Sequence, residues 1–301
     1  MITFKQLEAV FWVVRSGGFA QAANKLHTTQ SAVSKRIQEL EQQFNTPLFD
    51  RTLRAARMTE KGEEMFLLAR RLLEQRDEAL EQFLRPETLE RHFRIGVTEL
   101  SAMTWLPKLI GGIQSAYPRV IIEPHVDASA VLRDKLLADE IDLMIVPDMF
   151  NDQRFSSEPV ATVKHVWMSK PGMLETRDMH QMHDLAKMRL LIQDNNSGTG
   201  LLYNRWLQST GIHVENVITC SSMIALIGLT ISGMGISYLP ADSLQNMVSA
   251  GQLEILNVNP ALPPTTYVAV FKTDRKSVLM SSVMMLAKQH ADFGRLFQTG
   301  E

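Results

Sequence analysis

Apolar residues recur at helical spacing in three short segments near the start of the chain. The first segment predicts a helix that ends before the pair Gly17-Gly18, since its apolar positions are Leu7, Val10, Phe11 and Val14. Residues 19–26 are rich in alanine and predict a short second helix that another helix can approach closely. Residues 30–44 predict a third helix with one apolar face and Thr29 as its cap. The pattern therefore predicts two helices joined by a tight turn, preceded by a third.

The opposite face of the last of these helices carries groups that suit nucleic acid. Its polar side chains offer amides and hydroxyls for base edges and a cation for phosphate: Gln30, Ser31, Ser34, Lys35 and Gln38. Between Arg15 and Arg57 seven basic residues stand against three acidic ones, although the whole chain has a net charge of −2. Such a basic face fits either phosphate binding or an ordinary solvated surface.

A basic segment and a long amphipathic helix follow. Residues 47–57 predict a short basic wing, and residues 58–62 have the pattern of a new helix start. From Thr59 to about Leu84 no proline interrupts the sequence, and two series recur every seven residues: Phe66, Leu73 and Leu80, and Ala69, Arg76 and Phe83. The arginine interrupts this seam. The pattern therefore leaves open whether the helix pairs with a second copy or packs as a single long helix before the hinge at Pro86.

After about His92 short apolar strands alternate with helices. Strands are predicted at residues 93–97, 120–126, 141–146, 163–168, 190–193, 216–220, 236–239 and 267–271. Helices are predicted at residues 104–116, 130–139, 201–209, 222–231 and 278–287. This alternation predicts an α/β fold with two lobes.

Composition narrows the class of protein. Of 301 residues 45% are hydrophobic and 21% are charged, which suits a folded chain with two domains. The single cysteine, Cys220, cannot form a disulfide within the chain, and neither a secretion leader nor a run of about 20 apolar residues is recognisable. We therefore expect a cytoplasmic protein that makes no membrane contact.

Three other classes of protein fit the sequence less well. An enzyme is weakly indicated, because the glycine-rich residues 197–200 lack the lysine of a phosphate-binding loop, and His180 and His183 have no further metal ligand close by in sequence. An architectural DNA-binding protein would carry a strong positive charge. A solute-binding protein would lack the first ninety residues. We therefore expect no enzyme activity and no metal.

The N-terminal motifs resemble those of the LysR-type transcriptional regulators. The family's alanine-rich helix, its turn and recognition helix, its Leu-Glu pair, its wing and its next helix start stand here in order at residues 22–26, 29–34, 40–41, 47–51 and 58–62. Three positions depart from the commonest pattern, with Gly18 and Thr29 in place of serine and Asn45 in place of glycine. Glycine and threonine are acceptable caps, and asparagine tolerates the left-handed conformation that ends helices.

The resemblance covers nearly the whole chain and implies its organisation. It implies an N-terminal all-α winged helix-turn-helix at residues 1–58, a linker and dimerisation helix with its hinge at residues 59–91, and a two-lobed α/β effector domain at residues 92–301. This last domain is similar to periplasmic binding proteins, with lobe I at residues 92–161 and 268–301 and lobe II at residues 162–267. The motifs in this part are looser, and stand at residues 94–97, 105–107, 142–145 and 233–240.

The resemblance also assigns residues to DNA. It implies that the major groove is faced by Gln30, Ser31, Ser34 and Lys35, and that phosphates are reached by Thr29 and Arg36. Arg51 and Arg54 are implied to lie at or beside the wing. Arg51 follows Phe49 so closely that bracing the wing through a carboxylate is a second interpretation.

A small-molecule site is expected between the lobes, because ligands of open α/β sheets sit beyond the carboxyl ends of the strands, where helix N-termini offer backbone donors. This rule selects the loops at residues 98–101, 127–129, 147–149 and 195–199, with residues 221–223 as a further wall. The candidates within them are Thr98, Glu99, Leu100, Ser101, Ser129, Asp148, Met149, Asn195, Ser197, Thr199 and Met223. Helix capping is an equal interpretation for Ser101, Ser129 and Ser222.

Glu99 and the family resemblance together set the expected partners. A carboxylate framed by helix donors repels an acidic effector and favours a hydroxyl or ammonium group, unless it points into solvent. We therefore expect no cofactor apart from a small organic co-inducer that is not a simple dianion. The resemblance further implies double-stranded DNA with an interrupted inverted repeat, self-association as homodimer and homotetramer, and RNA polymerase as a candidate partner.

Overall fold

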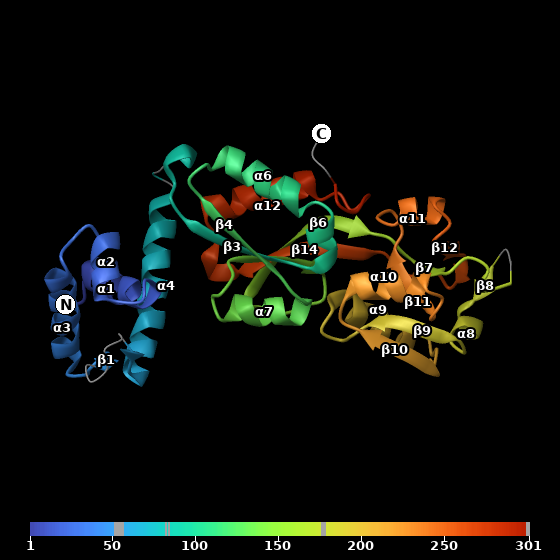
Figure 1. Ribbon diagram of the computed structural model, residues 1–301, viewed down its shortest axis with the longest axis horizontal. Helices are drawn as coiled ribbons and strands as arrows, with labels where there is room; N and C mark the ends of the chain where they lie inside the picture. The colour runs from blue at the N-terminus through green and yellow to red at the C-terminus, as the bar shows by residue number, and fades with distance from the viewer. Residues whose placement is uncertain (51–56, 82, 84, 176–178, 299–301) are drawn as a thin grey trace. The chain divides into compact units, whose positions relative to one another are not determined.

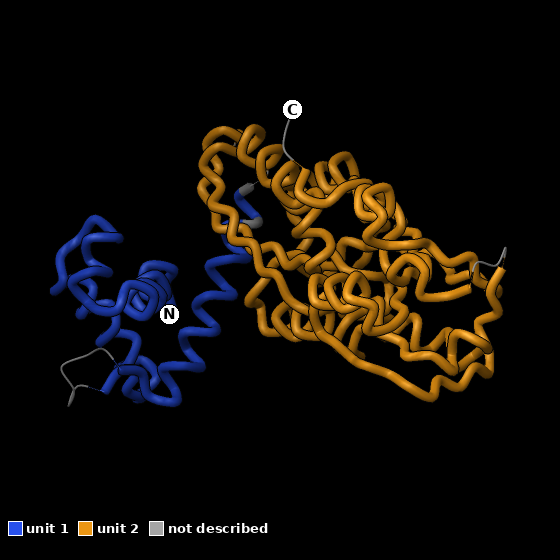
Figure 2. Tube along the Cα trace, turned by 45° about the vertical axis from the view of Figure 1, so that its right-hand side comes forward, with its two compact units in different colours: residues 1–83 blue, residues 84–301 orange. Residues whose placement is uncertain are grey.

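The computed structural model describes residues 1–50, 57–81, 83, 85–175 and 179–298. The chain divides into two compact units, residues 1–83 and residues 84–301 (Figure 2). This division places the long helix of residues 60–81 with the first unit. No helix in the described ranges is long and apolar enough to cross a membrane.

The first unit is a set of helices with a short two-stranded hairpin (Figure 1). Its elements are α1 (Phe4–Arg15), α2 (Phe19–Lys25), α3 (Gln30–Phe44), β1 (Phe49–Asp50), β2 (Arg57–Met58) and α4 (Glu60–Glu81). The helices predicted from the apolar spacing are confirmed. α3 begins where the Thr29 hydroxyl accepts the N–H of Ala32, and it ends at Asn45 with φ 49°.

Glu41 attaches α3 to the hairpin. Its carboxylate accepts the backbone N–H groups of Leu48 at 2.8 Å and of Phe49 at 3.3 Å. The Leu-Glu pair at residues 40–41 thus combines a buried apolar side chain with an acceptor for the chain entering β1.

Thr59 attaches the hairpin to α4. Its hydroxyl donates to the Pro47 carbonyl at 2.7 Å and accepts the N–H of Gly62 at 3.0 Å, so it caps the helix. A Cβ on Gly62 would lie 2.0 Å from the Leu48 carbonyl oxygen. Only glycine therefore fits this close approach, which explains the glycine of the motif at residues 58–62.

α4 packs along α1 of the same chain. Ala69 and Leu73 are buried against Leu7, and the ring of Phe66 stacks on Phe11 with 5.8 Å between centroids. Phe66, Ala69 and Leu73 of the expected seam therefore contact α1 of the same chain, and pairing of α4 with a second copy stays a prediction. The seam residues that stay exposed are Leu80 and Phe83.

The second unit contains two five-stranded sheets (Figure 1). The first has the strand order β4-β3-β5-β14-β6, made by β3 (His92–Val97), β4 (Ile121–Val126), β5 (Leu143–Pro147), β6 (Phe155–Val163) and β14 (Thr265–Lys272). The helices that accompany it are η1 (Pro86–Thr88), α5 (Glu99–Met103), α6 (Leu106–Ala116), α7 (Ser129–Leu137), η2 (Thr273–Arg275) and α12 (Val278–His290). α6 and α12 cover one face and α7 the other (Figure 1). We call this part lobe I.

The second sheet has the strand order β10-β9-β11-β7-β12, made by β7 (His165–Ser169), β9 (Arg189–Gln193), β10 (Asn216–Cys220), β11 (Ile236–Pro240) and β12 (Glu254–Leu256). Its helices are α8 (Met182–Leu185), α9 (Gly198–Ser209), α10 (Met223–Ile231) and α11 (Gln245–Ser249), and β8 (His180–Gln181) pairs with β13 (Val258–Asn259). We call this part lobe II.

The chain leaves lobe I through β6 and returns through β14, so it crosses between the lobes twice. These two strands pair along their length from Val163 opposite Thr265 to Phe155 opposite Lys272. The first sheet therefore reaches to Val163 and resumes at Thr265, whereas the crossings were expected after residue 161 and before residue 268.

Two predicted elements of this unit need correction. The strand expected at residues 163–168 corresponds to β7, while β6 was missed because Pro159 interrupts its apolar pattern and its pairing shifts register opposite Tyr267 and Val268. The helix expected at residues 104–116 corresponds to α6, which begins at Leu106, and the short helix α5 before it was missed. Pro107 lies in the first turn of α6, where a missing N–H costs nothing.

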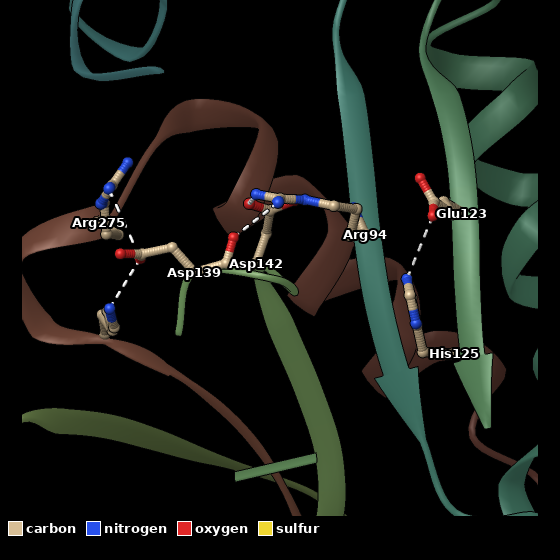
Figure 3. A network of polar contacts seen from close by, with 7 residues as sticks. Arg94, Glu123, His125, Asp139, Asp142 and Arg275 are labelled. Atoms are coloured by element: carbon tan, nitrogen blue, oxygen red, sulfur yellow. Dashed lines mark hydrogen bonds and ion pairs between the residues drawn. The ribbon is translucent and has the colours of Figure 1, made fainter. Parts of the chain in front are cut away.

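Two of the looser sequence motifs meet in one ion pair (Figure 3). Arg94 of β3 donates through Nε and Nη2 to both carboxylate oxygens of Asp142, which also accepts the Arg94 backbone N–H at 2.7 Å. Asp139, held at φ 56°, accepts from Lys272 at 2.7 Å. These largely buried contacts join β3, the start of β5 and the end of β14, so Arg94 and Asp142 have a structural role in lobe I.

His165 gives lobe II a pH-dependent stability. It is buried with its ring edge-on to Tyr203, and this burial lowers its pKa from 6.5 to about 4. Between these values the unfolded chain binds a proton that the folded chain does not, so stability is lost as the pH falls from about 6.5 towards 4. The loss amounts to about 3 kcal/mol if the shift is fully expressed. Between pH 7 and pH 4, we expect the free energy of unfolding of the wild type to fall by about 3 kcal/mol more than that of His165→Phe. Urea unfolding at the two pH values measures this difference.

The matched control is His213→Phe, which replaces an exposed histidine of the same lobe. Parallel pH dependences of the wild type and His165→Phe would contradict the assignment.

Candidate functional site

The polar face predicted on α3 is present in the first unit. Gln30, Ser31 and Lys35 are exposed, and Ser34 and Arg36 are half-buried. Thr29 lies at the helix start, where its hydroxyl is also 3.0 Å from that of Ser31. Arg51 and Arg54 lie outside the described residues, so their two interpretations stay predictions.

A further cation lies beside this face and was not singled out from the sequence. Lys25, at the end of α2, is exposed, and its ammonium group lies 5.0 Å from the centre of the Trp12 ring. The aromatic ring fixes a flexible side chain beside the turn that precedes α3. A lysine placed after an alanine-rich helix gives no such signal in sequence, because its partner is on α1.

In the second unit Glu99 joins the two lobes. It is the first residue of α5 in lobe I, and its carboxylate accepts the N–H of Met223 at 2.6 Å and the hydroxyl of Ser222 at 3.1 Å. Both donors belong to the N-terminus of α10 in lobe II. Glu99 therefore does not point into solvent, and Ser222, which lies in the predicted wall at residues 221–223, is part of this contact.

α7 and α9 make a second connection between the lobes. The Ser129 hydroxyl accepts the N–H of Gly198 at 3.1 Å, and the N–H of Ala130 donates to the Asn196 carbonyl at 3.0 Å. Ser129 is the first residue of α7 and contacts lobe II instead of capping its own helix, so the capping interpretation is wrong for it. Ser222 does cap α10, through the N–H of Ala225.

Tyr267 of β14 was also missed, and it lies near Thr98 and Thr199. Its side chain is buried, and this burial raises the pKa of its hydroxyl, while the neighbouring threonine hydroxyls act in the opposite direction. Thr98 precedes α5 in lobe I and Thr199 lies in α9 of lobe II. An aromatic residue inside an apolar strand is predicted to be a core residue. The position of its hydroxyl near the site is therefore known only from the fold.

The remaining predicted residues divide into two groups. Ser101 and Ser197 are polar and lie close to the contacts above. Ser101 lies within α5, and its buried hydroxyl has no hydrogen-bond partner among the described residues. Ser197 caps α9. Ser101 therefore does not cap a helix as one interpretation held. Of the other residues, Leu100 lies in the apolar core, Met149 is half-buried beside Gly198, and Asp148 and Asn195 are exposed.

The weak enzyme signals do not assemble into a site in the described part of the chain. His180 and His183 lie on β8 and α8, and in the described ranges no three His, Cys, Asp or Glu side chains are placed to hold a metal ion. Cys220 ends β10, with its sulfur 3.6 Å from the Ser222 carbonyl.

Comparison with known proteins agrees with this architecture. Residues 4–63 match the family described as bacterial regulatory helix-turn-helix protein, lysR family, and residues 86–292 match the LysR substrate binding domain. The transcriptional regulator MetR of Salmonella typhimurium is 25% identical over 297 residues, which cover 97% of this chain and 91% of that protein.

Solved structures show the same fold. An OxyR mutant from Corynebacterium glutamicum has a TM-score of 0.71 at 17% identity, covering 96% of this chain and 92% of that chain. Full-length CbnR complexed with its target DNA has a TM-score of 0.57 at 16% identity, covering 96% of this chain and 100% of that one.

A helix-turn-helix unit followed by a two-lobed α/β unit defines a class of ligand-responsive DNA-binding regulators. Because the two family matches together span most of its length, the chain belongs to the LysR family of bacterial transcriptional regulators. It is a sequence-specific DNA-binding regulator and not an enzyme, and its second unit is a binding domain for a small-molecule effector.

At Gly198 the backbone of α9 in lobe II closely approaches lobe I. A Cβ there would lie 2.8 Å from both the Ser129 hydroxyl and the Met149 sulfur and 3.0 Å from the Pro147 Cβ. We expect Gly198→Ala to separate α9 from α7 and to lower the free energy of unfolding of the second unit by about 1–3 kcal/mol. Urea unfolding followed by tryptophan fluorescence measures this change.

Gly228→Ala is the matched control, because its added methyl group meets nothing within 4 Å in α10. This variant should be as stable as the wild type or slightly more stable. If both variants unfold at the same urea concentration, the close approach at Gly198 carries no energetic weight.

Proposed function

We propose that the exposed polar face of α3 enters the major groove and reads an interrupted inverted repeat. The single observation that carries this proposal is the placement of Gln30, Ser31 and Lys35, which are exposed along one face at the start of a capped helix. Amide and hydroxyl groups there can contact base edges, since the N-terminal residues of a recognition helix are those that reach them.

The residues of this face have different tasks. Gln30, Ser31, Ser34 and Lys35 face bases, whereas Thr29 and Arg36 reach phosphates. A cation on a phosphate adds affinity for every sequence, while an amide or hydroxyl on a base edge adds discrimination. Arg51 and Arg54 complete the proposed contacts through the wing.

Two copies bind the two halves of the repeat. We propose that the first pairing uses the exposed part of α4, where Leu67, Leu80 and Phe83 form no contact that buries them in the chain. A second pairing uses the edges of the two sheets in the second unit. β4 and β10 are edge strands, and their exposed apolar residues are Ile121, Val126 and Val217.

A small organic effector binds between the lobes, against Thr98, Ser101 and Thr199. The support for this is that the buried hydroxyls of Ser101 and Thr98 have no hydrogen-bond partner among the described residues, and that Tyr267 lies near both Thr98 and Thr199. Such an effector changes DNA binding only as far as it prefers one arrangement of the lobes over another. The protein acts in the cytoplasm, where DNA and RNA polymerase are present.

Alanine substitutions separate the two kinds of DNA contact. We expect Gln30→Ala and Ser34→Ala to reduce discrimination between operator and random DNA by about 1–3 kcal/mol, because each removes a base contact. Arg36→Ala should weaken binding to all sequences and flatten the salt dependence, because it removes a phosphate contact. Fluorescence anisotropy with both DNA fragments at two salt concentrations measures these effects.

Gln43→Ala supplies the control, because Gln43 is an exposed glutamine at the far end of the same helix. It should leave both binding and discrimination unchanged. Equal losses on operator and random DNA for every variant of the face would show that α3 does not read sequence.

A further inference from the structure

The N-terminus of α10 holds a carboxylate that the chain itself supplies. The Met223 N–H and the Ser222 hydroxyl donate to the two oxygens of Glu99 at 2.6 Å and 3.1 Å. The Ser222 hydroxyl in turn accepts the N–H of Ala225 at 3.3 Å. Backbone and hydroxyl donors arranged in this way at the start of a helix of nine residues form a binding position for an anion.

The charge of Glu99 is balanced by this helix end. In the described part of the chain its carboxylate forms no ion pair with a lysine or arginine. A carboxylate at a helix N-terminus is stabilised by the partial positive charge of the unpaired amide groups. The contact therefore combines two hydrogen bonds with a charge–dipole attraction.

The same contact lies over a buried apolar layer that continues from one lobe to the other. Leu100 and Met103 of α5 belong to one core cluster with Met223 and Leu226 of α10. Glu99 is half-buried at the edge of this layer. A ligand carboxylate that approaches α10 must therefore displace Glu99, because both would need the same donors.

We propose that Glu99 is a built-in occupant of this anion position and thereby sets effector specificity. This inference rests on the proposed function, in which the effector binds between the lobes, and it names the chemistry that this wall of the site rejects. Carboxylate and phosphate groups are excluded from the start of α10. A ligand group that engages this wall is a donor, an amine or a hydroxyl, which binds the Glu99 carboxylate itself.

Removing the carboxylate tests the proposal, because the vacated donors should then take a small anion from solution. The full-length wild type, Glu99→Ala and Glu99→Gln are compared in sodium acetate and in sodium chloride of equal ionic strength, with the unfolding temperature as the readout. Glu99→Gln keeps the side-chain volume and blocks the position without its charge. Glu123→Ala removes a half-buried carboxylate of lobe I that contacts His125 and no helix end.

We expect acetate to raise the unfolding temperature of Glu99→Ala alone, with a saturating dependence on concentration. At roughly 100 mM the rise over chloride should be about 2 °C or more, as for a weak ligand that binds only the folded state. Should Glu99→Ala not fold in chloride, its refolding yield in the two salts replaces the unfolding temperature. Recovery in acetate but not in chloride is then the expected result.

The proposal is overturned if acetate shifts all four proteins equally, if it shifts none, or if refolding yields are the same in both salts. Operator binding of the same proteins keeps this result separate from the proposed function. If acetate has no effect but sequence-specific DNA binding is intact, only the role of Glu99 is refuted. If acetate has the expected effect but the protein does not bind operator DNA, the proposed DNA recognition is refuted and the anion position occupied by Glu99 is supported.

Discussion

The first amide groups of a helix have no acceptor within the helix, and in the second unit these groups find acceptors in the opposite lobe. The start of α10 donates to Glu99, the start of α9 donates to Ser129, and the start of α7 donates to the Asn196 carbonyl. Each bond links lobe I with lobe II. The relative position of the lobes therefore depends on satisfying backbone groups that would otherwise be buried at a cost.

This constraint gives the regulator a physical basis for switching. The lobes are connected by two strands, β6 and β14, and their contacts include the apolar layer and these helix-end bonds. An effector that competes for one of the bonds changes the free energy of one lobe arrangement relative to another, and the change cannot exceed its difference in affinity for the two. Glu99 determines which ligand groups can compete at the start of α10. The same contact therefore sets effector specificity and holds the two lobes together.

The sequence predicted those features that arise from neighbouring residues. The start of α3 at Thr29 and its end at Asn45 follow from local capping, and the apolar spacing of the first helices follows from one buried face. β10 was predicted with its observed bounds because five residues of simple strand pattern lie between turns. Local rules failed where Pro159 and a register shift obscure β6.

Contacts between distant residues were beyond the sequence. Glu99 and Met223 are 124 positions apart, and Arg94 and Asp142 are 48 apart, so neither pair can be inferred from spacing. The loops of the small-molecule site were predicted from a general rule of α/β sheets, but that rule does not say which of their side chains face the other lobe. This is why Leu100 and Asn195 were included and Tyr267 was not.

Amide hydrogen exchange at single-residue resolution tests the bond from Glu99 to α10 most directly. Met223 and Val278 are each the first residue of a helix whose serine cap accepts a later N–H, but in the described residues only the Met223 amide has a carboxylate as partner. The account predicts that the Met223 amide exchanges at least about ten times more slowly than the Val278 amide, since opening its bond requires separation of the lobes. Equally fast exchange of the two amides would contradict it.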